Sequence, residues 1–115
     1  MSKEEIEQKL AKLMDTVPEC EGLIAADIEG NVIVGQTITE MDHAAIAKSV
    51  AAIIKDSNLL GKNTGKGALK STTIELENGF AVLVGSEDKV FIALAGEDGK
   101  ASLGLLKRNL TKIAQ

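Results

Sequence analysis

ALKSTTIELENGFAVLVGSEDKVFIALAG, residues 68–96, is the stretch that decides the fold. It holds three apolar runs separated by two short polar segments. Asn78-Gly79 is a strong signal for a tight hairpin, and Ser86-Glu87-Asp88 predicts a second turn. Tight hairpins join strands that are antiparallel neighbours. The stretch therefore predicts three consecutive strands of one antiparallel sheet.

The first of these strands, expected over 69–76, is more polar than the two that follow it. It carries one lysine and three hydroxyl residues in a row: Lys70, Ser71, Thr72 and Thr73. Polar strands suit the edge of a sheet, where one side of the backbone is left without a neighbour. We therefore expect this strand at an edge, either exposed or paired with a second chain.

The N-terminal residues predict a helix. Apolar residues with the spacing of one helical stripe run through residues 6–17. Ser2 and Glu5 have the spacing of a capping box at the start of this helix, and Pro18 ends it.

A hairpin is expected next, in GLIAADIEGNVIVGQ, residues 22–36. Two apolar runs flank Glu29-Gly30-Asn31, where Gly and Asn supply the positive φ of a tight turn. Because both runs are almost entirely apolar, we expect both faces of these strands to be covered.

A second helix is predicted over residues 40–60, with Thr39 and Asp42 at capping-box spacing. Its apolar arc spans about 120° on a helical wheel, and Lys48 and Lys55 lie opposite. The arc consists of Ile46, Val50, Ile53, Ile54 and Leu60, extended by Ala47 and Ala51. This arc is wider than one sheet face requires, and its alanine flank favours close packing of a second helix.

The last helix is expected near 100–114, with its apolar stripe formed by Leu103, Leu106, Leu110 and Ile113. Gly104 lies inside it, and a glycine there costs up to about 1 kcal/mol relative to alanine. We expect a packing reason for it, such as close approach of a strand or another helix.

The elements together predict an α+β sandwich in one domain, residues 1–115. Its order is αββαβββα, with a five-stranded antiparallel sheet and helices on both faces.

Composition limits the function classes. The chain has 115 residues, of which 44% are hydrophobic and 2% aromatic, and its net charge is −4. An acidic chain with few stacking aromatics is not expected to bind nucleic acid. No apolar run approaches the length of a membrane span, and the polar N-terminus does not fit a signal peptide, so no direct membrane insertion is expected. Cys20, the single cysteine, cannot form an internal disulfide, which favours a reducing, cytoplasmic location.

The glycine-rich segment GKNTGKGALKST, residues 61–72, raises the question of a phosphate-binding loop. Only three residues separate Gly61 from Gly65, and Gly67 follows Lys66 where a hydroxyl residue is needed. The segment also follows a helix and precedes a strand, the reverse of the required order. We interpret it as a helix C-cap, with Gly61 in the left-handed conformation, and a connector.

No catalytic, cofactor or metal site is predicted. His43 is the only histidine, Ser49 lies about 240° around the helix from it, and Cys20 reaches it only through tertiary contact. One histidine with one cysteine does not supply the three or four ligands of a metal site. Asp27 and Glu29 share a hairpin end, where turn carboxylates are common.

Two stretches resemble the roadblock family. In PECEGLIAADIEGNVIVG, residues 18–35, a helix end runs into a strand of small and aliphatic residues and then Asp-x-x-Gly, here Asp27 to Gly30. VFIALAGEDGKASLGLLKRNLTKIA, residues 90–114, resembles the family's closing strand and helix, with Gly104 at the glycine position. The order of elements matches the roadblock fold over nearly the whole chain. In the longin fold, by contrast, a strand hairpin precedes any helix.

The resemblance implies a homodimer in which the third strands pair across a two-fold axis and the second helices lie side by side. The residues expected at that interface are Ile46, Val50, Ile53, Ile54, Thr72, Thr73 and Ile74. It also implies a surface for a small Ras-like GTPase on the second helix and adjoining loops. The candidates there are Lys48, Lys55, Asp56, Lys62 and Lys66. The lysine-rich, aromatic-poor composition suggests an archaeal or bacterial member.

Three functions are considered on this basis. The first is a non-enzymatic dimeric scaffold that binds a GTPase and modulates its nucleotide cycle, without an arginine finger, because the sole arginine, Arg108, lies in the last helix. The second is an assembly subunit that pairs with other roadblock or longin-like proteins without affecting hydrolysis. The third is a small-ligand sensor. No cofactor is expected for any of them.

Overall fold

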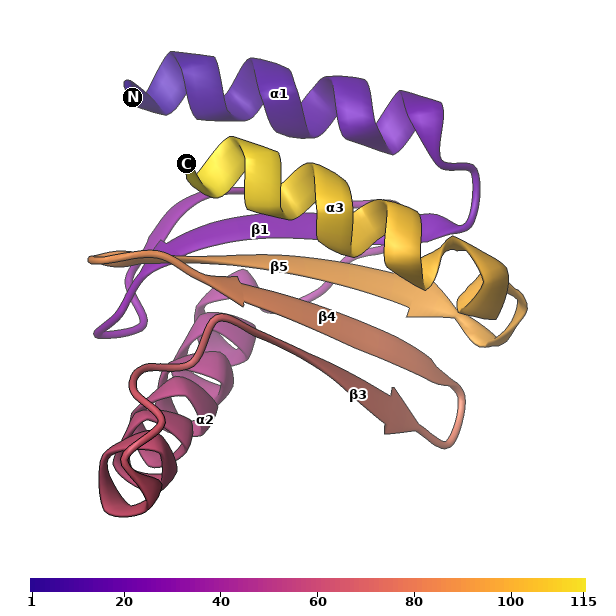
Figure 1. The fold of residues 1–115 in the computed structure, drawn as a ribbon. Coiled ribbons are helices and arrows are strands. Elements are labelled where there is room, and N and C mark those ends of the chain that lie inside the picture. The colour runs from indigo at the N-terminus through magenta and orange to yellow at the C-terminus, as the bar shows by residue number, and fades with distance from the viewer.

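The computed structural model describes residues 1–115, and its elements follow the predicted order (Figure 1). The N-terminal half contains α1 (Lys3–Thr16), β1 (Cys20–Asp27), β2 (Val32–Thr37) and α2 (His43–Thr64). The C-terminal half contains β3 (Ser71–Leu76), β4 (Gly79–Gly85), β5 (Lys89–Gly96), a 3₁₀ helix (Glu97–Ser102) and α3 (Leu103–Ala114). The predicted α+β sandwich is confirmed.

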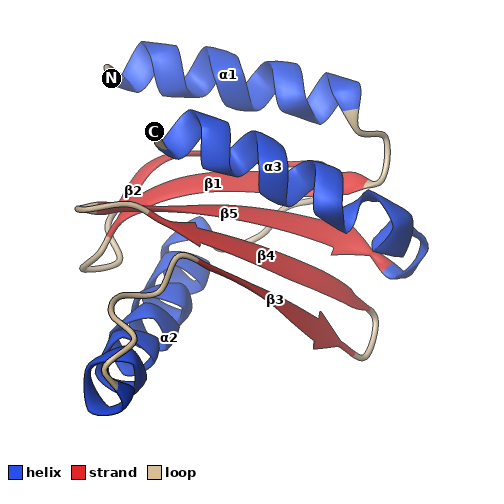
Figure 2. Ribbon diagram, viewed as in Figure 1, coloured by secondary structure: helices blue, strands red, loops and turns tan.

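The five strands form one sheet in the order β2-β1-β5-β4-β3, and all neighbours are antiparallel. Figure 2 shows α1 and α3 side by side on one face of the sheet and α2 on the other. The strand predicted over 69–76 does lie at an edge, as β3, and β2 forms the opposite edge. Both hairpin strands of 22–36 were expected to be covered on both faces. This is true of β1, which lies inside the sheet, whereas β2 remains partly exposed at the edge, where it has only one neighbour.

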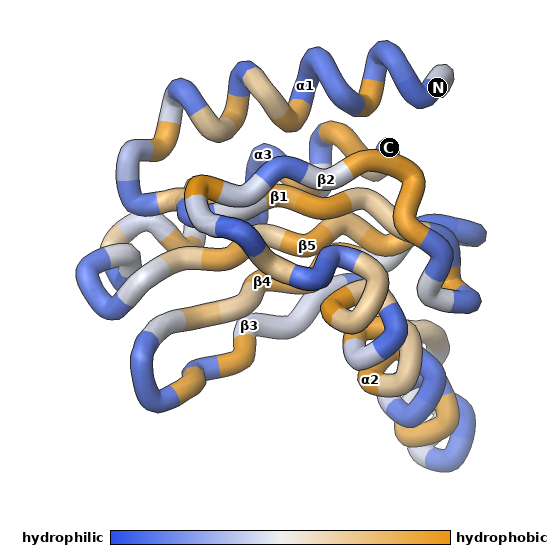
Figure 3. The backbone as a smooth tube through the Cα atoms, turned by 180° about the vertical axis from the view of Figure 1, so that it is seen from behind, coloured by the Kyte–Doolittle hydropathy of each residue, from blue (hydrophilic) through white to orange (hydrophobic).

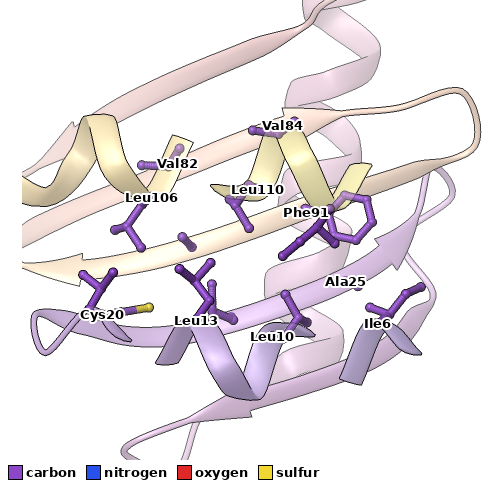
Figure 4. Close-up of a cluster of buried hydrophobic side chains, with 14 of the residues drawn as sticks. Ile6, Leu10, Leu13, Cys20, Ala25, Val82, Val84, Phe91, Leu106 and Leu110 are labelled. Carbon is purple, nitrogen blue, oxygen red and sulfur yellow. The ribbon is translucent and has the colours of Figure 1, made fainter. Parts of the chain in front are cut away.

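The larger part of the core lies between the sheet and the pair α1 and α3 (Figure 4). Aliphatic stripes of the two helices meet strand residues around Phe91. The fully buried side chains here include Ile6, Leu10, Leu23, Val82, Phe91, Leu106 and Leu110. Burying each such side chain contributes roughly 1.5–3 kcal/mol. The periodicity that predicted both helices therefore corresponds to one shared contact surface.

The second part of the core lies between the sheet and α2. It is smaller and contains no aromatic residue. Its buried members are Ile24, Ala26, Ala47, Val50, Ile54, Ala81, Leu83, Val90 and Ile92. Figure 3 shows apolar and polar residues alternating along α2, as expected for a helix that buries one side. The alanines shorten the distance between helix and sheet but bury little area each.

The structure corrects the limits of the second helix. It begins at His43, with Asp42 as the N-cap whose side chain accepts a hydrogen bond from the Ala45 amide, and it continues to Thr64. Gly61 is therefore a buried helical residue and not the left-handed cap. That conformation belongs to Gly65, with φ of 70°. The helix continues because the following loop folds back on Gly61, which no local pattern shows.

Two turns also differ in detail from their predictions. In the β1–β2 turn only Gly30 has positive φ (89°), and Asn31 does not. The β3–β4 hairpin forms as expected, but its two turn residues are Glu77 and Asn78, while Gly79 opens β4. Gly79 is required there because a Cβ atom would lie 2.4 Å from the carbonyl oxygen of Ala95 on β5.

The prediction that a strand or another helix packs closely on Gly104 is wrong. A Cβ atom at this position would meet no heavy atom within 4 Å. The buried stripe of α3 is formed by Leu106, Leu110 and Ile113, and Gly104 lies on the exposed side of the helix. By contrast, the predictions for α1 hold. Ser2 and Glu5 form a complete capping box, and the helix ends at Thr16, ahead of Pro18.

Candidate protein-interaction surfaces

The edge strand β3 presents unpaired backbone groups next to an apolar row. Ile74 lies opposite Ala81 on β4, and Ala81 lies opposite Leu94 on β5. Residues directly opposite in antiparallel strands share a face, so these three form a row across the sheet on the side of α2. Ile74 and Leu94 are only partly buried there. The row therefore offers apolar surface at an open edge.

The predicted interface residues occupy three different environments. Val50 and Ile54 are each 6% exposed and pack in the core between α2 and the sheet. Ile46 and Ile53 are partly buried beside them. Thr72, Thr73 and Ile74 lie on β3, where alternation sends Thr72 and Ile74 to the α2 side and Thr73 to the other. Their role in a dimer stays a prediction.

Leu94 was not among the predicted interface residues. Nothing in the local sequence separates it from the buried residues of β5, since the run Val-Phe-Ile-Ala-Leu-Ala is apolar throughout. Its partial exposure, in contrast to the fully buried Ile92 on the same face of β5, depends on where α2 packs on the sheet.

The outer side of α2 carries a line of lysines. Lys48, Lys55 and Lys62 are spaced by seven residues, which is two helical turns, and all three are exposed. The Lys48 ammonium donates hydrogen bonds to the backbone oxygen of Glu29 (3.3 Å) and to Asn31 Oδ1 (3.4 Å). Lys48 thereby ties the helix to the β1–β2 turn, while the other two make no ion pair.

The remaining candidates lie near this line. Asp56 is exposed on α2, and Lys66 is exposed in the loop that follows the helix. A hollow of about 440 Å³ between α2 and the β1–β2 turn lies beside Lys55. Its apolar lining includes Ile28, which is 47% exposed. The arrangement combines positive charge with apolar surface, as protein-binding surfaces often do.

The Asp-x-x-Gly turn owes its shape to Asp27. Its carboxylate accepts hydrogen bonds from the amides of Glu29 and Asn31, each at 2.9 Å, and from the Asn31 side chain at 3.0 Å. These bonds, chiefly those from Asn31, hold the pKa of Asp27 below its usual range. The Asp27 carboxylate therefore stabilises the turn, and its hydrogen bonds are to groups of that turn.

The nucleophile candidates do not come together. Cys20 is the first residue of β1 and is buried on the side of α1 and α3, and burial raises the pKa of its thiol. His43 starts α2 on the other side, and its Nε2 lies 3.0 Å from Thr37 Oγ1. Ser49 donates to the Ala45 carbonyl within the helix. The arrangement holds no nucleophile activated by a base.

The glycine-rich segment does not form a phosphate cradle. The backbone amides of Lys66 and Gly67 point back to the Gly61 carbonyl, at 2.8 and 3.2 Å, and so close the helix C-terminus. No group of three or more His, Cys, Asp or Glu side chains is placed to hold a metal ion. None of the helices has both the length and the apolar character needed to cross a membrane.

Comparisons with solved structures agree on the fold. The gliding protein MglB from Thermus thermophilus superposes with a TM-score of 0.80 at 16% identity, over 97% of this chain and 90% of that one. An MglB structure with a tetrameric arrangement gives 0.82 at 16% identity, over 97% and 89%. A Roadblock/LC7 domain from Streptomyces avermitilis gives 0.82 at 15% identity, over 93% and 89%.

Sequence comparison supplies the family. No curated protein sequence resembles this chain closely enough to count as a match. The family model described as the Roadblock/LC7 domain, however, matches residues 6–96, which is most of the 115-residue chain and includes all five strands. The resemblance seen in the Asp27–Gly30 segment is thereby confirmed, and the chain belongs to the Roadblock/LC7 family.

Proposed function

We propose that two copies of this chain pair along their β3 edges and α2 helices, and that the dimer binds a small Ras-like GTPase and modulates its nucleotide cycle. The observation that carries this proposal is membership of the Roadblock/LC7 family. The domain acts as a cytoplasmic scaffold and regulator and not as an enzyme in its own right.

The β3 edge supports the pairing. Strand β3 carries a single charged residue, Glu75, although exposed edges are commonly protected by charges, proline or bulges. Pairing of two β3 strands joins two five-stranded sheets and brings the partner's α2 towards the row of Ile74 and Leu94. An MglB structure with a tetrameric arrangement shows that a similar fold assembles into oligomers.

A pair of substitutions tests the dimer. Ile74→Glu places a charge on both sides of a two-fold interface, since each substitution occurs twice in a symmetric dimer. Burial of an isoleucine contributes about 1.5–3 kcal/mol, so we expect at least a tenfold weaker dimer by light scattering. Val32→Glu, at the opposite edge and already 37% exposed, is the matched control and should leave dimerisation unchanged. A wild-type protein that stays folded and monomeric at tens of micromolar contradicts the pairing.

The lysine line of α2 is the surface proposed for the GTPase. Lys55 and Lys62 are exposed and free of ion pairs, and Asp56 and Lys66 lie close by in the chain. Lys48 contributes less, because its ammonium is already bonded to the β1–β2 turn. Reversing charge with Lys55→Glu and Lys62→Glu should weaken binding without unfolding the domain.

Stimulation of hydrolysis would come from ordering the switch loops of the GTPase itself. An arginine finger has to project into the partner's active site. Arg108 lies on α3, on the opposite face of the sheet from α2. Arg108→Ala is therefore expected to leave any stimulation intact, and its complete loss in a folded variant contradicts this mechanism.

Binding assays with a Ras-like GTPase in its GTP and GDP forms separate this function from the alternative. Preference for one nucleotide state supports regulation. Equal binding to both states favours the assembly subunit, which pairs with other roadblock or longin-like proteins without affecting hydrolysis. Absence of binding to either state contradicts the GTPase proposal.

A further inference from the structure

The exposed side of α3 combines a glycine with a cluster of basic residues. Gly104 has open space above it, and the helix from Leu103 to Ala114 contains three basic residues and no acidic one. The chain as a whole carries a net charge of −4. This surface therefore has the opposite sign to the average of the molecule, and it lies on the opposite face of the sheet from α2.

Two hollows lie along this surface and share Lys112. One, of about 580 Å³, is lined by α3 and Gln115 and runs from Gly104 past Lys107 and Arg108. The other, of about 330 Å³, is the groove between α1 and α3, where Lys9 and Lys12 lie across from Lys112. No aspartate or glutamate side chain lines either hollow.

None of these five basic residues forms an ion pair in the structure. The single ion pair in the structure joins Lys89 and Asp88, elsewhere on the surface. Glu5 precedes Lys9 by one turn of α1, but its carboxylate is engaged with Ser2 in the capping box. Lys107 also borders a hollow that contains Glu87 and Asp88. Because none of the five is held in an ion pair, they can still attract an external anion.

We propose that the α3 surface and the adjoining α1–α3 groove form a docking site for an acidic helical segment of a partner protein. The absence of a side chain at Gly104 lets another backbone come close. Leu105, 40% exposed, offers an apolar contact next to it. Helix α3 has 12 residues and is about 18 Å long, so a segment of three to four turns matches it.

The shape of the surface favours a helix over the other polyanions. A helix laid in a groove is a common mode of peptide recognition, and the α1–α3 groove is concave. Single-stranded nucleic acid needs stacking aromatics, and the two phenylalanines, Phe80 and Phe91, are not on this surface. Leu105 is the one large apolar residue exposed on α3, which is little for insertion into a lipid surface.

This site lies across the sheet from α2, so it extends the proposed function without depending on it. A domain with docking surfaces on both faces of its sheet holds two partners at once, as a scaffold requires.

The test uses the full chain and an 18-residue blocked peptide of Glu, Ala and Leu with helical periodicity. Backbone amide NMR shifts should cluster at residues 104–112 and 9–12. The Lys107→Glu/Arg108→Glu double variant should weaken binding at least about tenfold, because two attractive pairs become repulsive. Gly104→Leu should weaken it by blocking the close approach, and it should fold normally in the open space at this position.

The matched control is Lys55→Glu/Lys62→Glu, which reverses two charges on the opposite face and should leave peptide affinity unchanged. A peptide with Gln in place of Glu should not bind. Binding should also fall as salt rises, because the Debye length shortens from about 10 Å at 0.1 M to about 3 Å at 1 M. Shifts on α2, equal loss in the control variant, or binding to phosphatidylserine vesicles but not to the peptide would each overturn the proposal.

Discussion

Gly61 and Gly104 both lie inside α-helices, yet replacement by alanine should have opposite effects at the two positions. Alanine favours a helix over glycine by up to about 1 kcal/mol at either site. At Gly104 the added methyl group enters open space. At Gly61 it would lie 1.6 Å from the carbonyl oxygen of Gly67, well inside the contact distance. The obstacle is backbone, so the loop after α2 has to move as a unit.

Displacing that loop breaks a defined set of contacts. The amides of Lys66 and Gly67 lose the Gly61 carbonyl, and the Leu69 amide loses Asn58 Oδ1 at 2.8 Å. Each net hydrogen bond contributes about 0.5–1.5 kcal/mol, with the lower end appropriate to this exposed loop. Three bonds then contribute about 2 kcal/mol, and partial exposure of Leu69 adds about 1 kcal/mol. Alanine's higher helix propensity offsets about 1 kcal/mol of this loss. Gly61→Ala should therefore destabilise the fold by about 2 kcal/mol.

Urea unfolding followed by circular dichroism measures both changes, at one protein concentration because dimerisation would shift the midpoint. For a chain of this size about 2 kcal/mol corresponds to a melting temperature lower by about 8 °C. Gly104→Ala should raise it by up to about 4 °C. A Gly61→Ala variant as stable as Gly104→Ala would refute the packing of the loop on the helix, and with it the extension of α2 to Thr64.

Three further predictions follow from burial and hydrogen bonding. The Cys20 thiol, buried and with a raised pKa, should react with a thiol reagent only on unfolding, so labelling at pH 8 should begin at the urea midpoint; rapid labelling of the native protein contradicts this. The lowered pKa of Asp27 means that its stabilising effect is complete above the unfolded-state pKa and is lost as pH falls through the folded-state pKa. Asp27→Asn should accordingly be less stable than wild type at pH 7, with the difference shrinking towards pH 2 in acid-unfolding curves; a constant difference would contradict the role of the carboxylate. Leu106→Ala empties a fully buried site between α3 and the sheet and should cost about 2–5 kcal/mol in urea unfolding, whereas Leu105→Ala, at an exposed neighbouring position, should cost less than about 1 kcal/mol.

Local patterns were sufficient to predict the elements and the family. The helical spacing of Ile6, Leu10 and Leu13, the stop at Pro18 and the hairpin near Asn78-Gly79 are properties of neighbouring residues. Since the periods of helix and strand are themselves local, these elements could be read without any tertiary information. The family resemblance depends on similar short segments, and the family model over residues 6–96 confirms it.

Other features are decided by contacts between residues that are distant in the sequence. The apolar arc of α2 showed that Val50 and Ile53 share a side, but only the packing of the helix on the sheet decides that the first is buried and the second partly exposed. The row from Ile74 to Leu94 exists because of strand register, which pairs residues 20 positions apart through an intervening strand.

Glycine shows the difference between the two sources of information most directly. From the sequence, Gly61 was expected to cap a helix and Gly104 to pack closely, since glycine commonly does both. The structure contradicts both expectations: the loop packs on Gly61, and nothing packs on Gly104. The sequence by itself determined the elements, because their hydrogen bonds and apolar periods are local. Tertiary structure decided which surfaces remain exposed, because burial depends on what the rest of the chain brings alongside.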